Sequence, residues 1–147
     1  MILSALRPGC RILDLCCGTG HLSAAFCRRR LNVVGLDGSY DMLRFAKQNA
    51  PQAEFVVADA RTFQFSDNFD AVIAVGDSLN HMLTSRDLGA VFGNVIIALK
   101  PGGTFIFDLN VPEAFRTEWH KSSTVVGTDL LMYVRGSYDK SEPENSR

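Results

Sequence analysis

The sequence lacks long hydrophobic runs and a strong excess of charge of either sign. No apolar stretch approaches the ~20 residues that a membrane-spanning helix needs. The start of the chain, MILSALRP, has no basic segment before its short apolar stretch, so we expect neither a signal peptide nor an anchor. The net charge is −1, which argues against a broad basic surface for DNA. A chain of 147 residues, 46% hydrophobic and 21% charged, is typical of one globular domain.

Cysteine is scarce and confined to one end of the chain. The four cysteines are Cys10, Cys16, Cys17 and Cys27, and none follows them in the sequence. A disulfide framework would be spread along the chain to join distant parts. The spacing also lacks the C-x-x-C pairs of a structural zinc site. We therefore predict free thiols, no metal ion and a reducing compartment, the cytoplasm.

Apolar runs and amphipathic segments alternate along the first 110 residues. Helices are expected after Gly20, after a capping Ser39 and after a Thr84-x-x-Asp87 capping pattern. The predicted strands cover residues 11–16, 31–36, 53–58, 69–75 and 104–109. This alternation predicts an α/β fold, a Rossmann-like parallel sheet with helices on both faces. Ligands of such sheets bind beyond the carboxyl ends of the strands.

A glycine turn follows the first predicted strand, in RILDLCCGTG. Gly18 and Gly20 allow the backbone to approach a ligand closely. No Gly-Lys-Ser/Thr follows, which excludes a phosphate-binding loop. The third glycine of the dinucleotide fingerprint is replaced by Ser23, which argues against NAD as the ligand and leaves it as an alternative.

Three aspartates accompany the first three predicted strands. Asp37 ends the second strand, where one carboxylate can accept hydrogen bonds from both hydroxyls of a ribose. Asp59 ends the third strand and can accept from the exocyclic amine of an adenine. Asp14 lies inside the first strand, where a carboxylate needs a hydrogen-bonding partner. Acidic groups around a cleft suit S-adenosylmethionine, which carries an ammonium and a sulfonium, better than a pyrophosphate.

Five segments in order resemble the class I S-adenosylmethionine-dependent methyltransferases of the small, soluble kind: LDLCCGTG, VVGLDGSYDML, FVVADA, FDAVIAVGDSLNHM and LKPGGTFIFDLN. The resemblance covers about residues 9–110. Cys16 replaces the first glycine of the family's first motif, and we expect main-chain contact there rather than thiol chemistry. Besides the aspartates and glycines above, the resemblance implies cofactor contacts at Cys16, Gly38, Met42, Ala60 and Val75.

The resemblance implies in-line transfer of a methyl group from the sulfonium to a nucleophile, in which the protein mainly aligns the reactants. For an acceptor that carries a proton, the candidate bases are Asp77, Asn80 and His81. Simpler interpretations are a capping role for Asp77 and a surface position for His81. The Asn/Asp-Pro-Pro-aromatic motif of many enzymes that methylate bases is missing after the fourth strand, and no Pro-Cys nucleophile is present. A small-molecule acceptor is therefore favoured over DNA, with a tRNA base or a protein side chain left open.

The resemblance also sets the expected domain organisation. Residues 1–110 are predicted as the cofactor-binding core, residues 111–138 as an incomplete antiparallel insertion on the substrate side, and residues 139–147 as a disordered tail. The family's domain normally has a helix before the first strand and two more strands after the fifth, so we expect a chain truncated at both ends. Two functions stay open: an active small-molecule methyltransferase and a catalytically impaired cofactor-binding fragment. An NAD-dependent oxidoreductase is the third alternative.

Overall fold

The computed structural model describes residues 6–66, 68–110, 122–126 and 131–135. Contacts between residues divide the chain into two compact units, Met1–Asp108 and Leu109–Arg147. None of the helices in the described ranges is long and apolar enough to cross a membrane.

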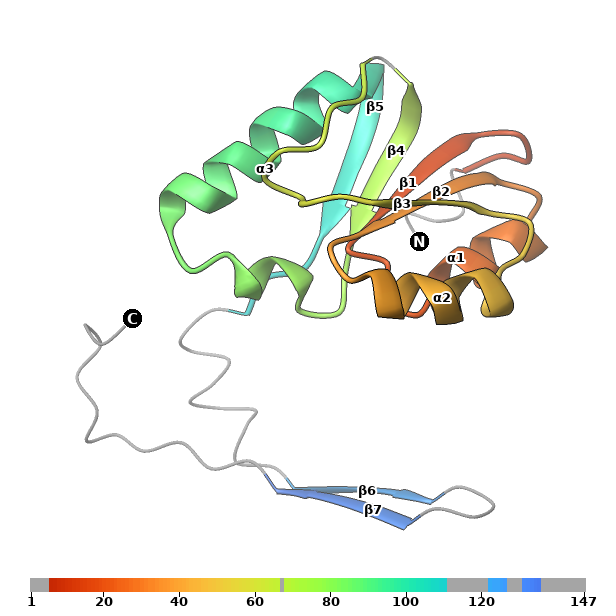
Figure 1. Ribbon diagram of the computed structural model, residues 1–147, viewed down its shortest axis with the longest axis vertical. Helices are drawn as coiled ribbons and strands as arrows, with labels where there is room; N and C mark the ends of the chain where they lie inside the picture. Colours follow the sequence, from red (N-terminus) through yellow and green to blue (C-terminus); the bar gives the residue numbers. More distant parts are fainter. Residues whose placement is uncertain (1–5, 67, 111–121, 127–130, 136–147) are drawn as a thin grey trace. The chain divides into compact units, whose positions relative to one another are not determined.

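The first unit is built on a sheet of five parallel strands (Figure 1). The order of its strands is β3-β2-β1-β4-β5. The chain therefore runs outward from β1 to β2 and β3 on one side, and then crosses to β4 and β5 on the other side. The predicted α/β fold with a parallel sheet is therefore confirmed, and the switch point where ligands bind lies between β1 and β4. The strands are β1 (Arg11–Leu15), β2 (Asn32–Asp37), β3 (Glu54–Val57), β4 (Phe69–Ala74) and β5 (Leu99–Phe107).

Helices cover both faces of this sheet. α1 (His21–Arg28) and α2 (Tyr40–Asn49) lie side by side on one face, and α3 (Ser85–Ala98) lies on the other (Figure 1). Side chains of β1 alternate between two core clusters, Ile12 on the α1 side and Leu13 on the α3 side. Both are fully buried, as expected of a parallel strand that is covered on both faces.

Two helices begin at the caps that the sequence predicts. The Ser39 hydroxyl accepts a hydrogen bond from the Met42 amide at 3.3 Å, and the Thr84 hydroxyl accepts one from the Asp87 amide at 3.0 Å. These bonds satisfy amides that have no partner within the first turn of a helix. Both capping predictions are confirmed, and α2 starts directly after β2, whereas α3 follows β4 after an intervening loop.

The fifth strand differs from its predicted bounds. It runs over Leu99–Phe107 rather than 104–109, because Leu99 already pairs with Phe69 and the chain rejoins β4 at Thr104 after an irregular bulge. Residues 101–103, Pro-Gly-Gly, lie in this bulge instead of ending the helix, which stops at Ala98. The strand ends one residue before Asp108, so this aspartate stands at the carboxyl edge of the sheet.

The second unit contains an antiparallel strand pair. β6 (Ser122–Val126) pairs with β7 (Leu131–Arg135), with Val126 opposite Leu131. The predicted turn at 127–129 and the predicted tail at 139–147 lie outside the described residues. The assignment of residues 111–138 to a substrate-side insertion stays a prediction.

Candidate functional site

The turn after β1 is held in an unusual backbone conformation. Cys16, Gly18 and Gly20 all have positive φ, at 58°, 54° and 75°. The Gly20 amide donates to the Cys17 carbonyl at 2.9 Å, which closes the turn before α1 begins. A Cβ on Gly20 would lie 2.9 Å from Ala46 Cα, so glycine is needed there for α1 to approach α2. The chain therefore reaches α1 along a fixed path at the edge of the sheet.

The carboxylate of Asp37 joins this turn to the next one. Asp37 is the last residue of β2 and is half-buried. One of its oxygens, Oδ2, accepts from the Gly18 amide at 2.8 Å, and Oδ1 accepts from the Ser39 amide at 2.9 Å. Each carboxylate oxygen can accept a further hydrogen bond. The residue predicted to hold a ribose thus also fixes both backbone turns around it.

Asp14 lies beneath the glycine turn. It is 3% exposed, and its Oδ2 accepts from the Ser23 hydroxyl of α1 at 2.5 Å. Burial raises the pKa of Asp14 to about 6, although the hydrogen bond from Ser23 lowers it in part. The serine that replaces the third fingerprint glycine is therefore the partner that this buried acid requires. Asp14 therefore lies below the turn and has almost no surface of its own to offer a ligand.

Asp59 sits at the same edge, beyond β3. Its carboxylate accepts from Arg61 Nη2 at 2.6 Å and from the Arg61 amide at 2.8 Å. These hydrogen bonds lower the pKa of Asp59 to about 2, so the group is ionised at neutral pH. The neighbouring backbone is tied to β2, because the Ala58 amide donates to the Asp37 carbonyl at 3.1 Å. The structure therefore brings the acids predicted at the ends of β2 and β3 to one edge.

The remaining predicted contacts lie around these acids. Gly38 is exposed in the turn after β2, and Met42, in the first turn of α2, is 46% exposed. Ala60 is 6% exposed, and Val75 is 38% exposed after β4. Met42 and Val75 thus offer apolar surface at the edge, whereas Ala60 can offer only its backbone.

The cysteine thiols beside the turn are poor nucleophiles. Cys16 and Cys17 are free, and burial together with nearby negative charge raises the pKa of both. For Cys16 the pKa is about 11, so the thiol is protonated at neutral pH. Within the described ranges, no group of three His, Cys, Asp or Glu is arranged to hold a metal ion.

The loop after β4 forms the other half of the carboxyl edge. Gly76 and Asp77 have φ of 81° and 63°, and the 3₁₀ helix η2 (Ser78–His81) follows. Leu79, 1% exposed, anchors η2 in the core, and His81 is exposed. Asp77 occupies the N-cap position of η2, where its carbonyl accepts from the Asn80 amide at 3.0 Å, although its side chain makes no cap bond. The loop therefore places the exposed candidates Asp77 and His81 at the edge, and the third candidate, Asn80, is half-buried between them.

One residue of this edge was missed from the sequence. Asp108 follows β5, and its Oδ2 accepts from the Gly76 amide at 2.8 Å while Oδ1 accepts from the Asp77 amide at 3.2 Å. The signal that singled out Asp37, an acid at a strand end, is also present at Asp108. The predicted strand ran through residue 109 and so hid it.

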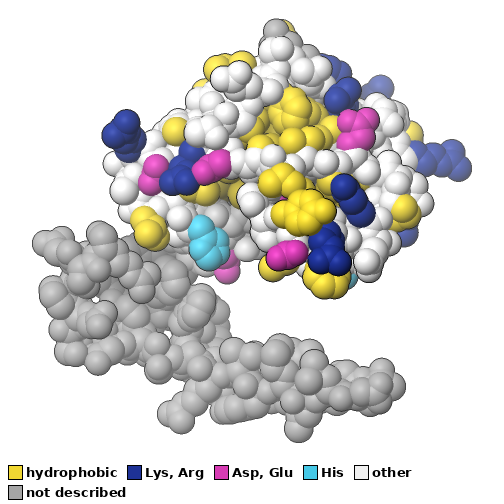
Figure 2. Space-filling model, viewed as in Figure 1, with side chains coloured by type: hydrophobic (Ala, Val, Ile, Leu, Met, Phe, Trp, Pro, Cys, Tyr) yellow, Lys and Arg dark blue, Asp and Glu magenta, His cyan; other side chains and the backbone are white. Residues whose placement is uncertain are grey.

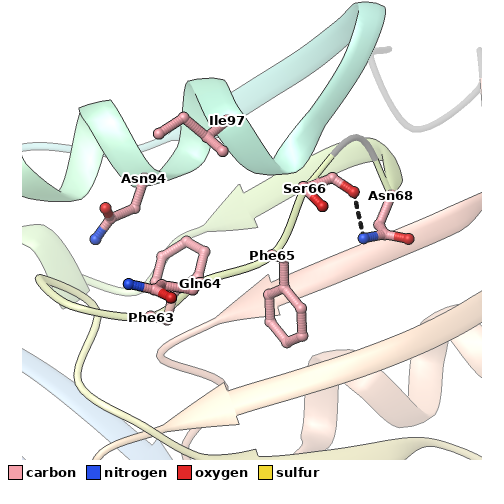
Figure 3. Close-up of a pocket in the computed structure, with 7 residues that line it drawn as sticks. All are labelled: Phe63, Gln64, Phe65, Ser66, Asn68, Asn94 and Ile97. Carbon is pink, nitrogen blue, oxygen red and sulfur yellow. Dashed lines mark hydrogen bonds between the residues drawn. The ribbon is translucent and has the colours of Figure 1, made fainter.

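A pocket of about 580 Å³ lies elsewhere on the first unit. Figure 3 shows Phe63 and Phe65, from the segment before β4, near Asn94 and Ile97 of α3. Figure 2 shows hydrophobic side chains gathered on this face. The segment leads into the amino end of β4, and Asn94 and Ile97 belong to the end of α3 that leads into β5. This pocket therefore lies away from the carboxyl edge that carries the candidate site.

Comparisons with known proteins match the same part of the chain. The model of a methyltransferase domain matches residues 12–103. A dTDP-3-amino-3,4,6-trideoxy-alpha-D-glucopyranose N,N-dimethyltransferase of Streptomyces venezuelae is 31% identical over 100% of this chain and 62% of its own length. A demethylmenaquinone methyltransferase of Renibacterium salmoninarum is 34% identical over 67% of this chain and 40% of its own length.

A solved structure extends this similarity to the fold. The S-adenosylmethionine-dependent methyltransferase from Clostridium acetobutylicum ATCC 824 has a TM-score of 0.70 and 27% identity, covering 88% of this chain and 55% of that one. The chain thus spans 62% or less of the length of each of these three proteins.

Proposed function

Because the chain belongs to the methyltransferase-domain family of S-adenosylmethionine-dependent enzymes, we propose that it transfers a methyl group from this cofactor to a small molecule. The observation that carries the proposal is the Asp37 carboxylate, which bonds the Gly18 and Ser39 amides at the edge where Asp59 also lies. The two carboxylates can accept hydrogen bonds from the hydroxyls of a ribose and from an amine. The sequence of its glycine turn lacks the lysine of a phosphate-binding loop.

The residues at this edge bind different parts of the cofactor. Asp37 accepts from the ribose hydroxyls, and Asp59 accepts from the adenine amine beside the Ala60 backbone. Gly38 and Met42 lie against the adenosine. The turn from Cys16 to Gly20 contributes main-chain contacts, and the negative charge of Asp14 below it favours the cationic end of the ligand.

The methyl acceptor binds at the other half of the edge, after β4. The relatives named above act on an amino sugar nucleotide and on a demethylmenaquinone. Both are small molecules, which supports a small acceptor with a nitrogen or carbon nucleophile for this chain. Val75 borders this region, and Asp77 or His81 accepts the proton of an acceptor that has one to lose. We propose no DNA or membrane partner, and a cytoplasmic location stays a prediction.

Calorimetric titration with S-adenosylhomocysteine, alongside NADH, tests the cofactor. We expect saturable binding of S-adenosylhomocysteine only, together with a rise in Tm, because a ligand that binds only the native state stabilises it. Binding of NADH without S-adenosylhomocysteine would favour the oxidoreductase instead.

Methyl transfer is a separate question, because the chain spans only part of its relatives. Incubation with methyl-labelled S-adenosylmethionine and a panel that holds an amino sugar nucleotide, a simple amino acid and a quinol tests it. Transfer to one member supports the active enzyme. Cofactor binding with no transfer to any member supports the second candidate, a cofactor-binding fragment.

A further inference from the structure

We infer that Asp108 is a positioning residue that holds the Gly76–Asp77 turn in place on the acceptor side of the site. This inference rests on the proposed function, because the turn matters only if a methyl acceptor meets the cofactor there. Asp108 acts through the backbone that it binds, and no role in proton transfer is assigned to it.

The geometry is that of a clamp between two neighbouring strands. Both oxygens of Asp108 accept a backbone amide, from Gly76 at 2.8 Å and from Asp77 at 3.2 Å, across 32 and 31 residues of sequence. The Asp108 amide itself donates to the Ala74 carbonyl at 3.3 Å. Three hydrogen bonds therefore join the end of β5 to the end of β4 and its loop.

The turn that Asp108 holds needs such support. Gly76 and Asp77 are consecutive residues with positive φ, and for a residue with a side chain this conformation is unfavourable. A charged acceptor that binds both amides compensates for that cost. On the far side of the turn, the Ser78 hydroxyl donates to the Val75 carbonyl at 3.0 Å, and Leu79 is anchored in the core. The turn is thus fixed from both ends, with Asp108 as the charged partner.

Asp37 provides an internal parallel. On the cofactor side, Asp37 at the end of β2 accepts the amide of Gly18, which has positive φ and follows the neighbouring strand β1. On the acceptor side, Asp108, directly after β5, accepts the amide of Gly76, which has positive φ and follows the neighbouring strand β4. β1 and β4 are neighbours and enclose the switch point. One kind of clamp therefore sets the two loops between which cofactor and acceptor meet.

The chain also offers a matched control at the opposite edge. Asp70 accepts the Arg11 amide at 2.7 Å, again between neighbouring strands, but at the amino ends of β4 and β1. Its substitution removes a comparable clamp far from the loops. Asp70→Asn should lower the stability of the fold without altering ligand selectivity.

The experiment compares two ligands in four proteins. The ligands are S-adenosylhomocysteine and sinefungin, an analogue that carries an amine where the transferable methyl group sits. The proteins are the parent, Asp108→Asn, Asp108→Glu and Asp70→Asn, each checked for folding by thermal denaturation. We expect Asp108→Asn to weaken sinefungin about fivefold relative to S-adenosylhomocysteine, the factor that the loss of one hydrogen bond gives. Asp70→Asn should leave the ratio of the two Kd values unchanged.

Asp108→Glu separates position from charge. Its carboxylate keeps the charge but stands one methylene further from the two amides, so we expect the same loss of sinefungin selectivity as for Asp108→Asn. Amide hydrogen exchange of Gly76 and Asp77 should also accelerate in both Asp108 variants and not in Asp70→Asn.

Two results would overturn the inference alone, with the cofactor still bound by the parent. One is an unchanged Kd ratio in Asp108→Asn, and the other is full recovery of the ratio by Asp108→Glu, which would assign the effect to charge. A parent protein that binds neither ligand would instead reject the proposed function, and the role of Asp108 with it.

Discussion

The cofactor side and the acceptor side of the site use the same construction in different surroundings. Each has a loop with positive φ after one strand and an aspartate at the end of the neighbouring strand: Asp37 accepts one amide of the loop after β1, and Asp108 accepts two amides of the loop after β4. On the cofactor side, Gly18 and Asp37 are half-buried, with Asp14 buried beneath them. On the acceptor side, Gly76, Asp77 and Asp108 are all exposed.

This difference changes what each clamp contributes. A hydrogen bond to a charged group is stronger where water is excluded, and an exposed one competes with solvent. The cofactor half is therefore the more firmly preformed of the two, because water competes with the exposed hydrogen bonds that hold the acceptor half.

The largest expected effect falls on the cofactor side. Asp37→Asn removes the charge and turns one acceptor into a donor that faces the Gly18 or Ser39 amide. Both the ribose contact and the turn suffer, so we expect cofactor binding to weaken by roughly 2–4 kcal/mol, about thirty-fold to a thousand-fold. Calorimetry with S-adenosylhomocysteine measures it.

Glu54→Gln is the matched control for that substitution. Glu54 is an exposed acid at the first residue of β3, away from the carboxyl edge, and its variant should bind like the parent. If Asp37→Asn also bound like the parent, the cofactor side would not be the preformed half.

The buried acid below the turn predicts a dependence of stability on pH. The pKa of Asp14 is raised to about 6 by burial, so the folded state holds its proton more tightly than the unfolded state. The stabilisation is complete below about pH 4 and is lost as the pH rises through 6, on the order of 1–3 kcal/mol. The Asp14→Asn variant has no titrating group at this position, so it does not lose this stabilisation as the pH rises. Urea denaturation at pH 4 and pH 7 should therefore show a smaller fall in the free energy of unfolding for the variant.

Asp70 supplies the control of opposite sign. The hydrogen bond from Lys100 lowers the pKa of Asp70, so its stabilisation is present above about pH 4 and is lost as the pH falls below that, which a further measurement at pH 3 covers. Asp70→Asn should thus change the pH dependence in the opposite direction to Asp14→Asn. Equal pH dependence in the parent and Asp14→Asn would contradict the buried, charged interpretation of Asp14.

A smaller effect is expected at Asp59, the exposed acid of the cofactor side. It contacts one amine at most, and its side chain is 41% exposed, so Asp59→Asn should weaken S-adenosylhomocysteine by about 1 kcal/mol, roughly fivefold. The inosine analogue lacks that amine and serves as the control ligand. It should bind the parent and Asp59→Asn equally, and a loss for both ligands would show that Asp59 acts on the loop rather than on adenine.

The sequence predicted the first unit well because its central strands β1, β2 and β4 are short apolar runs that are buried on both faces, and because turn and cap residues separate the elements. Asp37 and Asp59 were found because an acid directly after an apolar run is visible without knowledge of the fold. Asp108 has the same pattern, but the apolar Leu109 beyond it extended the predicted strand to residue 109, whereas β5 ends at Phe107.

The hydrogen-bonding partners of the aspartates could not be predicted from the sequence. Ser23 contacts Asp14 only because α1 packs across β1, and Asp108 reaches Gly76 across 32 residues. Arg61 is close to Asp59 in sequence, yet its side chain could equally have remained in solvent. Such contacts depend on tertiary packing, which residue patterns do not encode.

The smallest effect separates backbone from side chain in the cofactor turn. Cys16→Gly relieves a positive φ of 58°, which a side chain tolerates poorly, but removes a half-buried sulfur and adds freedom to the unfolded chain. Each of these contributions is about 1 kcal/mol, so the net change in the free energy of unfolding should stay within about 1 kcal/mol. If the turn serves through its main chain, the Kd for S-adenosylhomocysteine should also stay within about twofold of the parent value. Cys27→Ser, at the carboxyl end of α1, controls for the loss of a thiol. A tenfold weaker Kd in Cys16→Gly alone would show that the cysteine side chain, and not the clamped backbone, forms this half of the site.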